Sequence, residues 1–187
     1  MHNPRINILV LNWNGINVIN ECVESIMKSN YENYYITIID NGSTDNSIQS
    51  LINNKKINLI EIEENLGYGK GYNYAFEHIR NINDDYYLLL NNDTIIHKDT
   101  ISNLVHSTII YGSENIYGPN ILNTLNNKNW FCGGGISLFN GMPFHRGINT
   151  SNLTTSFKTS EVDYVSGCCM MLSKQLLIKL NGFNELF

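Results

Sequence analysis

Apolar runs alternate with amphipathic stretches through the first half of the chain. Runs that are apolar almost throughout predict strands covered on both faces. These runs lie at Ile6–Trp13, Tyr34–Asp40, Ile57–Ile62 and Tyr86–Leu90. Apolar residues at the spacing of one helix face occur within residues 14–29, 43–54, 65–80 and 98–111. Because parallel strands need crossover connections of this kind, the pattern predicts an α/β fold with a mostly parallel sheet flanked by helices.

Two of the predicted helices carry specific expectations. Ser43 or Thr44 is expected to cap the helix after the second strand. The inner face of that helix is expected to hold Ile48, Leu51 and Ile52. In the helix over 98–111, the residues expected to be buried are Ile101, Leu104, Val105 and Ile109.

The second half of the chain is less regular. Short strands are predicted within residues 115–122, 129–139 and 162–172. Residues 140–160 are polar and lack an apolar period, so we expect a long surface loop, which is often a functional element. Ser173 is expected to cap a short helix over Lys174–Leu180, with Gly182 at its C-terminal end.

Length and composition fit one globular domain, or one domain cut short. The 187 residues are 42% hydrophobic and 16% charged, which argues against disorder. The net charge of −5 gives no basic surface for nucleic acid. No apolar run approaches the roughly 18 residues of a membrane helix, and the N-terminus lacks the features of a signal peptide. The cysteines form no C-x-x-C pair, as expected for reduced thiols in a cytosolic protein.

Polar clusters follow each of the long predicted strands. The clusters are Asn12–Asn14, Asp40–Asp45, Asn65–Asn73 and Asn91–Asp93. In open α/β sheets, ligands bind beyond the carboxyl ends of the strands. All of the clusters are expected at that edge, so we predict one shared binding site there.

Each cluster has a structural alternative when it is considered alone. Asp40 could accept hydrogen bonds from a base or ribose, or the residues after it could form only a turn and a helix cap. Asp93 offers the oxygen ligand that Mg²⁺ or Mn²⁺ prefers, although an Asx-type turn would use the same residues. A single carboxylate holds such an ion weakly, which suits a metal that arrives bridging a diphosphate. Gly167 interrupts a predicted strand and marks either a close approach or simple packing.

The glycine-rich stretch Asn65–Asn73 favours phosphate binding but matches no common nucleotide motif. Glycines before a helix let backbone amides approach a phosphate. Gly67, Gly69 and Gly71 lack the spacing of the dinucleotide fingerprint, which normally follows the first strand. No Gly-Lys-Ser/Thr closes the stretch, so it is not a P-loop either. A dinucleotide-dependent dehydrogenase is therefore disfavoured.

In this order, the clusters resemble the motifs of glycosyltransferase family 2, an inverting family with the Rossmann-like A-type glycosyltransferase fold. The matching stretches are Asn12–Asn14, Asp40–Asp45, Asn65–Gly67 with Gly71 and Asn73, Leu90–Thr94, Ser166–Gly167 and Gly182–Phe187. The sequence is most similar to the bacterial branch that adds rhamnose and related sugars to surface polysaccharides. The resemblance covers essentially the whole chain, so we expect one catalytic core over residues 1–187.

The resemblance implies a donor site and a metal site. The donor-binding residues that it implies are Leu11, Asn12, Asn14, Asp40, Asn65, Gly67, Asn73, Asn91, Asn92, Ser166 and Gly167. Asp40 would recognise the nucleotide base. Asn91-x-Asp93 would stand where the family has Asp-x-Asp, so that Asp93 coordinates Mn²⁺ or Mg²⁺ and Asn91 touches the ribose or a metal-bound water. Residues 1–112 would bind the nucleotide sugar, and residues 113–187 would face the sugar and acceptor.

The resemblance also implies a reaction. A sugar would leave a nucleoside diphosphate such as UDP or dTDP, while a hydroxyl of a saccharide or lipid-linked acceptor attacks from the opposite face. The metal would stabilise the charge on the leaving diphosphate, and a carboxylate would act as general base. We expect the protein in the cytoplasm, either free or at the inner face of the membrane.

Two departures from the family concern the general base. The family commonly has Gly-Phe-Asp-Glu near this point, whereas this chain has Gly-Phe-Asn-Glu ending at Glu185. The acidic pair that usually follows, and further helices for acceptor or membrane contact, would lie beyond Phe187. We therefore expect a C-terminally truncated core in which Glu185 and Asp163 are the remaining candidate bases. Two alternatives stay open: a donor-binding protein with weak or no transfer, and a nucleotidyltransferase, which normally has a basic loop after its first strand.

Overall fold

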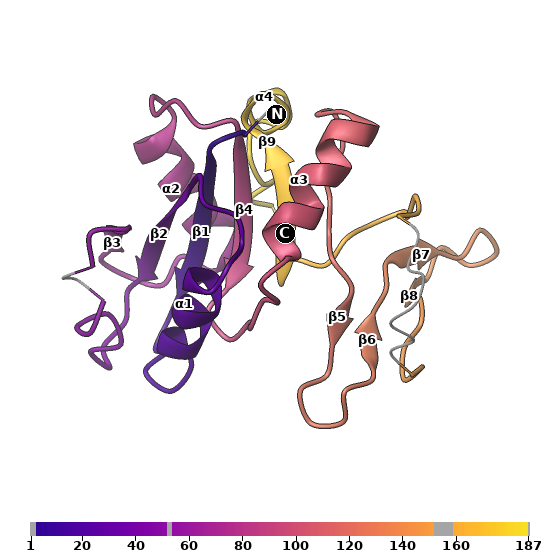
Figure 1. Cartoon of the computed structure of the whole chain (residues 1–187), viewed down its shortest axis with the longest axis horizontal. Helices are drawn as coiled ribbons and strands as arrows, with labels where there is room; N and C mark the ends of the chain where they lie inside the picture. Colours follow the sequence, from indigo (N-terminus) through magenta and orange to yellow (C-terminus); the bar gives the residue numbers. More distant parts are fainter. Residues whose placement is uncertain (1–2, 52–53, 152–158, 187) are drawn as a thin grey trace.

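A computed structural model of the chain describes residues 3–51, 54–151 and 159–186. Its strands are β1 (Ile6–Asn12), β2 (Tyr34–Asn41), β3 (Ile57–Ile62), β4 (Tyr86–Asn91), β5 (Ile121–Leu122), β6 (Asn129–Phe131), β7 (Gly134–Ile136), β8 (Pro143–His145) and β9 (Cys169–Ser173). Its helices are α1 (Ile19–Met27), α2 (Tyr68–Ile79), α3 (Thr100–Tyr111) and α4 (Lys174–Leu180). Figure 1 shows a central sheet among the helices and a group of short strands beside it.

The central sheet has five strands in the order β3-β2-β1-β4-β9. β1 pairs in parallel with β2 and β4, and β2 pairs in parallel with β3. β9 is antiparallel to β4. β1, β2 and β4 are almost wholly buried because both faces of the sheet are covered. The predicted α/β class, with a mostly parallel sheet flanked by helices, is confirmed.

Two apolar clusters cover the two faces of the sheet. On one face, Ile8 and Val10 of β1 belong to a cluster with α1 and α3. On the other face, Leu9 of β1 belongs to a cluster with α2 and α4. Neighbouring residues of β1 therefore alternate between the clusters, with the period of two that a strand imposes. This packing fixes the rotation of β1, whose carboxyl end carries Asn12.

The prediction of a helix after β2 is wrong within the described residues. Residues 46–51 form turns instead. The hydroxyl of Ser43 cannot cap a helix there, because it is hydrogen-bonded to Asp40 and to the Asn14 amide. Asn46 adopts a positive φ of 59°, a left-handed conformation that interrupts a right-handed helix.

The apolar pattern predicts which side chains are buried better than it predicts which residues form a helix. Ile48 and Leu51 are buried as predicted, although they lie in turns, and Ile52 lies outside the described residues. The prediction that Ile109 of α3 is buried is wrong, because its side chain is 56% exposed. Thr108 is buried in its place, and the 100° step from one helix residue to the next turns Ile109 away from the sheet.

Residues 119–151 form a lobe that we call the arm. It consists of two small antiparallel sheets, β5-β6 and β7-β8. A bridge between Gly134 and Tyr164 ties β7 to the chain that returns to the central sheet. Figure 1 shows the arm beside the sheet, on the side of α3 and β9.

The predictions for the second half are confirmed in part. Residues 140–160 are not all loop, because Pro143–His145 forms β8, and residues 152–158 lie outside the described residues. Ser173 caps α4 as predicted, since its hydroxyl accepts a hydrogen bond from Leu176 N–H at 3.0 Å. Neither α4 nor any other helix among the described residues has the length and apolar character to cross a membrane.

Candidate functional site

The carboxyl ends of β2, β1 and β4 lie side by side. Asn12 is opposite Asp40 in the β1–β2 register, and Leu11 is opposite Asn91 in the β1–β4 register. Predicted donor residues from three separate polar clusters therefore meet at one edge of the sheet. This edge is the position at which open α/β sheets bind ligands, and it is the candidate functional site.

Asn12 is the centre of a hydrogen-bond network at this edge. Its side-chain amide group donates to Asp40 Oδ1 at 3.1 Å and to Ser47 Oγ at 2.9 Å, and lies 3.2 Å from Ser43 Oγ. Its Oδ1 accepts from Asn92 Nδ2 at 2.8 Å. Asp40 is buried, and among the described residues its Oδ2 has no hydrogen-bond partner. The network therefore fixes the Asp40 carboxylate and leaves one oxygen available.

Asn14 orders the loops around this network. Its backbone N–H donates to Ser43 Oγ at 2.9 Å, and its side-chain oxygen accepts from Thr44 N–H at 2.8 Å. Gly15 follows, and a Cβ atom there would lie 2.3 Å from Asn12 Oδ1. The contacts of Asn14 join the loops after β1 and β2, while its role in donor binding stays a prediction.

A second network, around Asn41, was not predicted. Asn41 Nδ2 donates to Asn65 Oδ1 at 3.0 Å and to the Gly67 carbonyl at 3.1 Å. Asn41 Oδ1 accepts from Leu66 N–H at 3.0 Å. Asn41 thus holds the glycine-rich stretch against β2. The signal in the sequence was a second polar residue directly after Asp40, at the end of an apolar strand.

Asp93 is exposed on the turn that follows β4. In this turn the Asn91 carbonyl accepts from Thr94 N–H at 3.2 Å. The buried Cys22 lies close by, and its thiol is 3.6 Å from the Asn91 carbonyl. Burial and the charge of Asp93 raise the pKa of the Cys22 thiol to about 12.

The oxygen donors on this turn fit a hard divalent cation that other ligands help to hold. Within the described residues, no group of three or more His, Cys, Asp or Glu side chains could hold a metal ion. The turn supplies the Asp93 carboxylate and the amide oxygen of Asn91. Mg²⁺ prefers about six oxygen ligands and keeps several waters, so a bound diphosphate and water would complete the set.

The segment Ser166–Gly167 lies beside the same turn. The carbonyl of Cys168 accepts from Asn91 N–H at 3.1 Å. The Tyr68 hydroxyl donates to the Gly167 carbonyl at 2.7 Å, and a Cβ atom at Gly167 would lie 3.0 Å from that hydroxyl. Of the two alternatives for Gly167, the structure favours the close approach. The approaching group is Tyr68, which the sequence did not single out.

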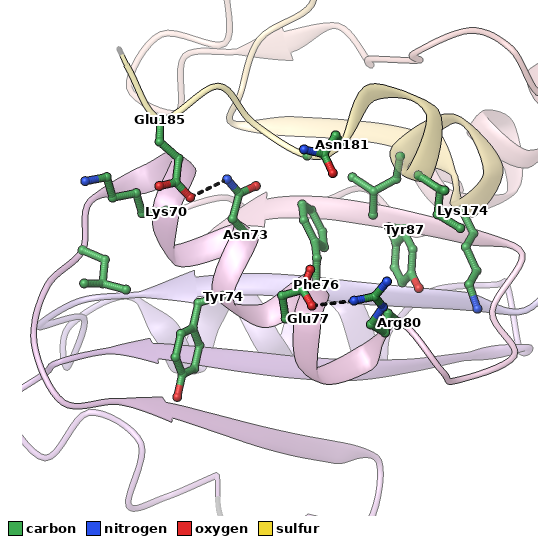
Figure 2. A pocket seen from close by; sticks show the side chains of 14 residues that line it. Lys70, Asn73, Tyr74, Phe76, Glu77, Arg80, Tyr87, Lys174, Asn181 and Glu185 are labelled. Carbon is green, nitrogen blue, oxygen red and sulfur yellow. Dashed lines mark hydrogen bonds and ion pairs between the residues drawn. The ribbon is translucent and has the colours of Figure 1, made fainter.

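Asn73 clamps the segment after α4 onto α2. Its Oδ1 accepts from Phe183 N–H at 2.8 Å, and its Nδ2 donates to the Phe183 carbonyl and to Glu185 Oε1, both at 2.9 Å. Figure 2 shows Asn73 and Glu185 facing each other at one end of a pocket of about 470 Å³ between α2 and α4. The predicted donor role of Asn73 stays a prediction, and the structure adds this clamp.

Asp163, the other candidate base, lies at the root of the arm. Its Oδ2 accepts from Ile136 N–H at 2.7 Å, and its backbone N–H donates to the Gly134 carbonyl at 3.0 Å. Both candidate bases therefore already hold a described neighbour through a carboxylate oxygen. Glu185 is held by α2 and Asp163 by β7, so they are attached to different parts of the molecule.

Solved structures of glycosyltransferases share this fold. A mannosyltransferase from Pyrobaculum calidifontis, in complex with GDP-Man and Mn²⁺, has a TM-score of 0.69 at 15% identity, over 99% of this chain and 49% of that one. TarS of S. aureus, residues 1–349 in complex with UDP-GlcNAc, has a TM-score of 0.60 at 17% identity, over 95% of this chain and 47% of that one. These likenesses show that the chain has the A-type glycosyltransferase fold.

The chain belongs to glycosyltransferase family 2, because the model of that family, Glycosyl transferase family 2, matches residues 7–180. An uncharacterized glycosyltransferase of Rickettsia felis is 30% identical over 138 residues, which are 72% of this chain and 20% of that protein. One of Rickettsia typhi is 24% identical, over 98% of this chain and 55% of that protein. The chain thus spans about half, or less, of the length of these relatives.

Proposed function

We propose that this chain binds a nucleoside-diphosphate sugar and, as part of an inverting glycosyltransferase, transfers the sugar to a saccharide or lipid-linked acceptor in polysaccharide synthesis. The observation that carries the proposal is one hydrogen-bond network, next to Asp93, that joins the side chains of Asp40, Asn12 and Asn92. Solved structures of the same fold in complex with GDP-Man or UDP-GlcNAc support a donor of this chemical class. UDP- and dTDP-sugars are the donors to test first.

The nucleoside end of the donor is assigned to the fixed carboxylate of Asp40. Asn12 and Ser43 are hydrogen-bonded to Oδ1 of that carboxylate. Oδ2 would therefore accept a hydrogen bond from an N–H or O–H group of the base or ribose. Because the Asp40 carboxylate is already fixed in position, it loses little conformational freedom when it binds the nucleoside. The Asn41 network holds Asn65 and Gly67 nearby, where backbone amides would meet the ribose and phosphates.

The diphosphate end is assigned to the turn after β4. Asp93 and Asn91 would hold Mn²⁺ or Mg²⁺ together with the diphosphate oxygens. When bound, a divalent cation acts as a Lewis acid that stabilises negative charge on the leaving diphosphate. The segment Ser166–Gly167 lies against this turn, through the bond from Asn91 N–H to the Cys168 carbonyl, and would border the sugar.

The acceptor hydroxyl needs a general base, and Glu185 is our candidate among the described residues. It is exposed, and Asn73 orients its carboxylate. Asp163 is the weaker candidate because the β7 backbone already uses its carboxylate. A second candidate function, donor binding with slow or no transfer, is favoured by the hydrogen bonds that both carboxylates already make. In either case we propose a protein in the cytoplasm, either free or at the inner face of the membrane.

The test is calorimetric titration of the chain with UDP and dTDP, with their sugars, and with the matching triphosphates, in Mn²⁺ and in chelator. We expect the diphosphate sugars to bind only with metal, and the Asp93→Asn variant to lose at least about ten-fold in that affinity without a change in thermal midpoint. Glu63→Gln, at an exposed carboxylate after β3, is the matched control. Unchanged affinity in Asp93→Asn, or preference for a triphosphate, would overturn the proposal.

Transfer is measured separately from binding. With a donor that binds, release of nucleoside diphosphate is compared between the chain and its Glu185→Gln variant. Loss of turnover with unchanged donor affinity supports Glu185 as base. Donor binding without turnover in the unaltered chain supports the second candidate function.

A further inference from the structure

The arm ends in an exposed apolar tip, which we define as residues 136–144. Leu138 and Phe139 are almost fully exposed, at 104% and 98% of the reference area for each residue. Met142 is 61% exposed and Phe144 50% exposed. Isolated exposed apolar residues are common in soluble proteins, but a contiguous apolar group usually marks an interaction site. The tip is therefore a candidate interaction site.

The tip is an ordered turn that backbone hydrogen bonds hold together. Ser137 N–H donates to the Met142 carbonyl at 2.9 Å, and Gly141 N–H donates to the Ser137 carbonyl at 2.8 Å. Gly141 adopts a φ of 68°, which its missing side chain allows. The Asp163 carboxylate holds the first strand of the hairpin through Ile136 N–H. The fold thus presents Leu138 and Phe139 to solvent on an ordered support.

The charge of this part of the chain differs from that of the rest. Residues 115–160 contain no Asp or Glu, although the whole chain has 17 such residues and a net charge of −5. The basic residue Arg146 follows β8, and its guanidinium donates to the Glu161 carbonyl at 3.0 Å. The carboxylates that follow the arm belong to Glu161 and Asp163, and that of Asp163 is occupied at the root of the hairpin.

The shape and chemistry of the tip favour a lipid surface over a second copy of the chain. A stable protein interface buries roughly 1,200 Å² or more in total, and the end of a single hairpin is too small to provide it. Apolar side chains on an arm that contains Lys128 and Arg146 but no Asp or Glu suit the headgroup region of an anionic bilayer. Figure 1 shows β7 and β8 at the end of the arm farthest from the central sheet.

We propose that the tip inserts Leu138 and Phe139 into the surface of an anionic lipid bilayer. The apolar side chains enter the headgroup and upper acyl region, and the acid-free arm is attracted by the negative surface. This inference does not depend on the identity of the donor or on catalysis. It gives residues 136–144 a function that the donor site does not use.

The experiment is co-sedimentation of the chain with vesicles of phosphatidylcholine alone or mixed with phosphatidylglycerol. We expect binding to the mixed vesicles that weakens at high salt. Leu138→Ser combined with Phe139→Ser is expected to reduce the partition coefficient by at least about ten-fold. Leu125→Ser is the matched control, because Leu125 is 94% exposed on the β5–β6 turn of the same arm and should leave binding unchanged.

Each other outcome overturns the inference. Equal vesicle binding by the double variant shows that the tip is not the contact, and equal binding to both vesicle types shows that charge plays no part. A decrease in sedimentation mass of the free chain on substitution identifies a second copy as the partner. Circular dichroism establishes that the variants are folded, and the salt and lipid dependence of the unaltered chain tests the proposal without any substitution.

Discussion

The central sheet and the arm hold their residues in place by different means. In the sheet, β1, β2 and β4 pair in unbroken parallel register and are buried on both faces. In the arm, strands of two or three residues pair in two separate sheets, with a register shift at Ile121/Leu122. A two-stranded hairpin is marginally stable by itself. The sheet can therefore fix a chemical site, whereas the arm depends on a few side chains to keep its shape.

The largest effect is expected from a cavity in the sheet. Leu88 of β4 is fully buried, so Leu88→Ala should lower the free energy of unfolding by about 2–5 kcal/mol. Phe131→Ala removes a buried ring from the arm, where it packs against His145 and Tyr164. If the two regions unfold separately, Phe131→Ala leaves the urea midpoint of the sheet in place and increases proteolysis within the arm. A shift of that midpoint as large as for Leu88→Ala would show that they form one cooperative unit.

A smaller effect is expected at the loop after β2. Gly42 has a φ of 74°, and a Cβ atom there would lie 2.6 Å from the Glu64 backbone. Gly42→Ala should cost about 1–3 kcal/mol in the free energy of unfolding. Gly112→Ala is the control, since Gly112 also has a positive φ, of 91°, but open space around it. Equal losses for the two variants, measured by urea denaturation, would mean that strain and not crowding decides the cost.

A local effect is expected at the Asn73 clamp. Asn73→Ala removes three hydrogen bonds to Phe183 and Glu185, each worth about 0.5–1.5 kcal/mol. Hydrogen exchange should become faster at the Phe183 amide while the β1 amides keep their protection. Tyr74→Ala, at the next residue of α2, is the control. Unchanged exchange at Phe183 would show that the stacking of its ring against Phe76, and not the clamp, holds the segment.

The smallest effect is a pH dependence at the far end of the sheet. Burial raises the pKa of the Asp84 carboxyl above its ordinary 3.8, although a hydrogen bond from Tyr35 and the charge of Arg5 lower it. The folded state therefore binds its proton more tightly than the unfolded state, so this contribution to stability falls as pH rises from 3.8 through the raised pKa. The free energy of unfolding of Asp84→Asn, measured by urea titration relative to the unaltered chain, should therefore be higher at neutral than at acidic pH. An offset that does not depend on pH would contradict the shift.

The sequence was sufficient for the sheet because its apolar runs are long and its crossovers are regular. It failed after β2, where Ser43 and Thr44 look like helix caps but are hydrogen-bonded to Asp40 and Asn14. It could not place the hairpin of β7 and β8, since Pro143–His145 has no alternation to mark a strand. Short strands draw their stability from contacts distant in sequence, which a local pattern does not contain.

The candidate site was predicted in the same uneven way. The cluster positions followed from the topology, because parallel strands place their carboxyl ends together. The division of roles inside the clusters did not follow, since Asn41 and Tyr68 act through partners 24 to 99 residues away. Hydrogen bonds of that kind are visible only when the chain is folded.

The antiparallel strand β9 has a consequence for how the chain is made on the ribosome. β4 emerges early, but the strand that covers its open edge, with Leu88 opposite Met171, is synthesised only after the whole arm. During that interval β4 offers unpaired amides and leucines to any passing strand. The nascent polypeptide is thus exposed to misassociation for as long as translation takes to cross the arm. Rare codons placed there would lengthen the interval.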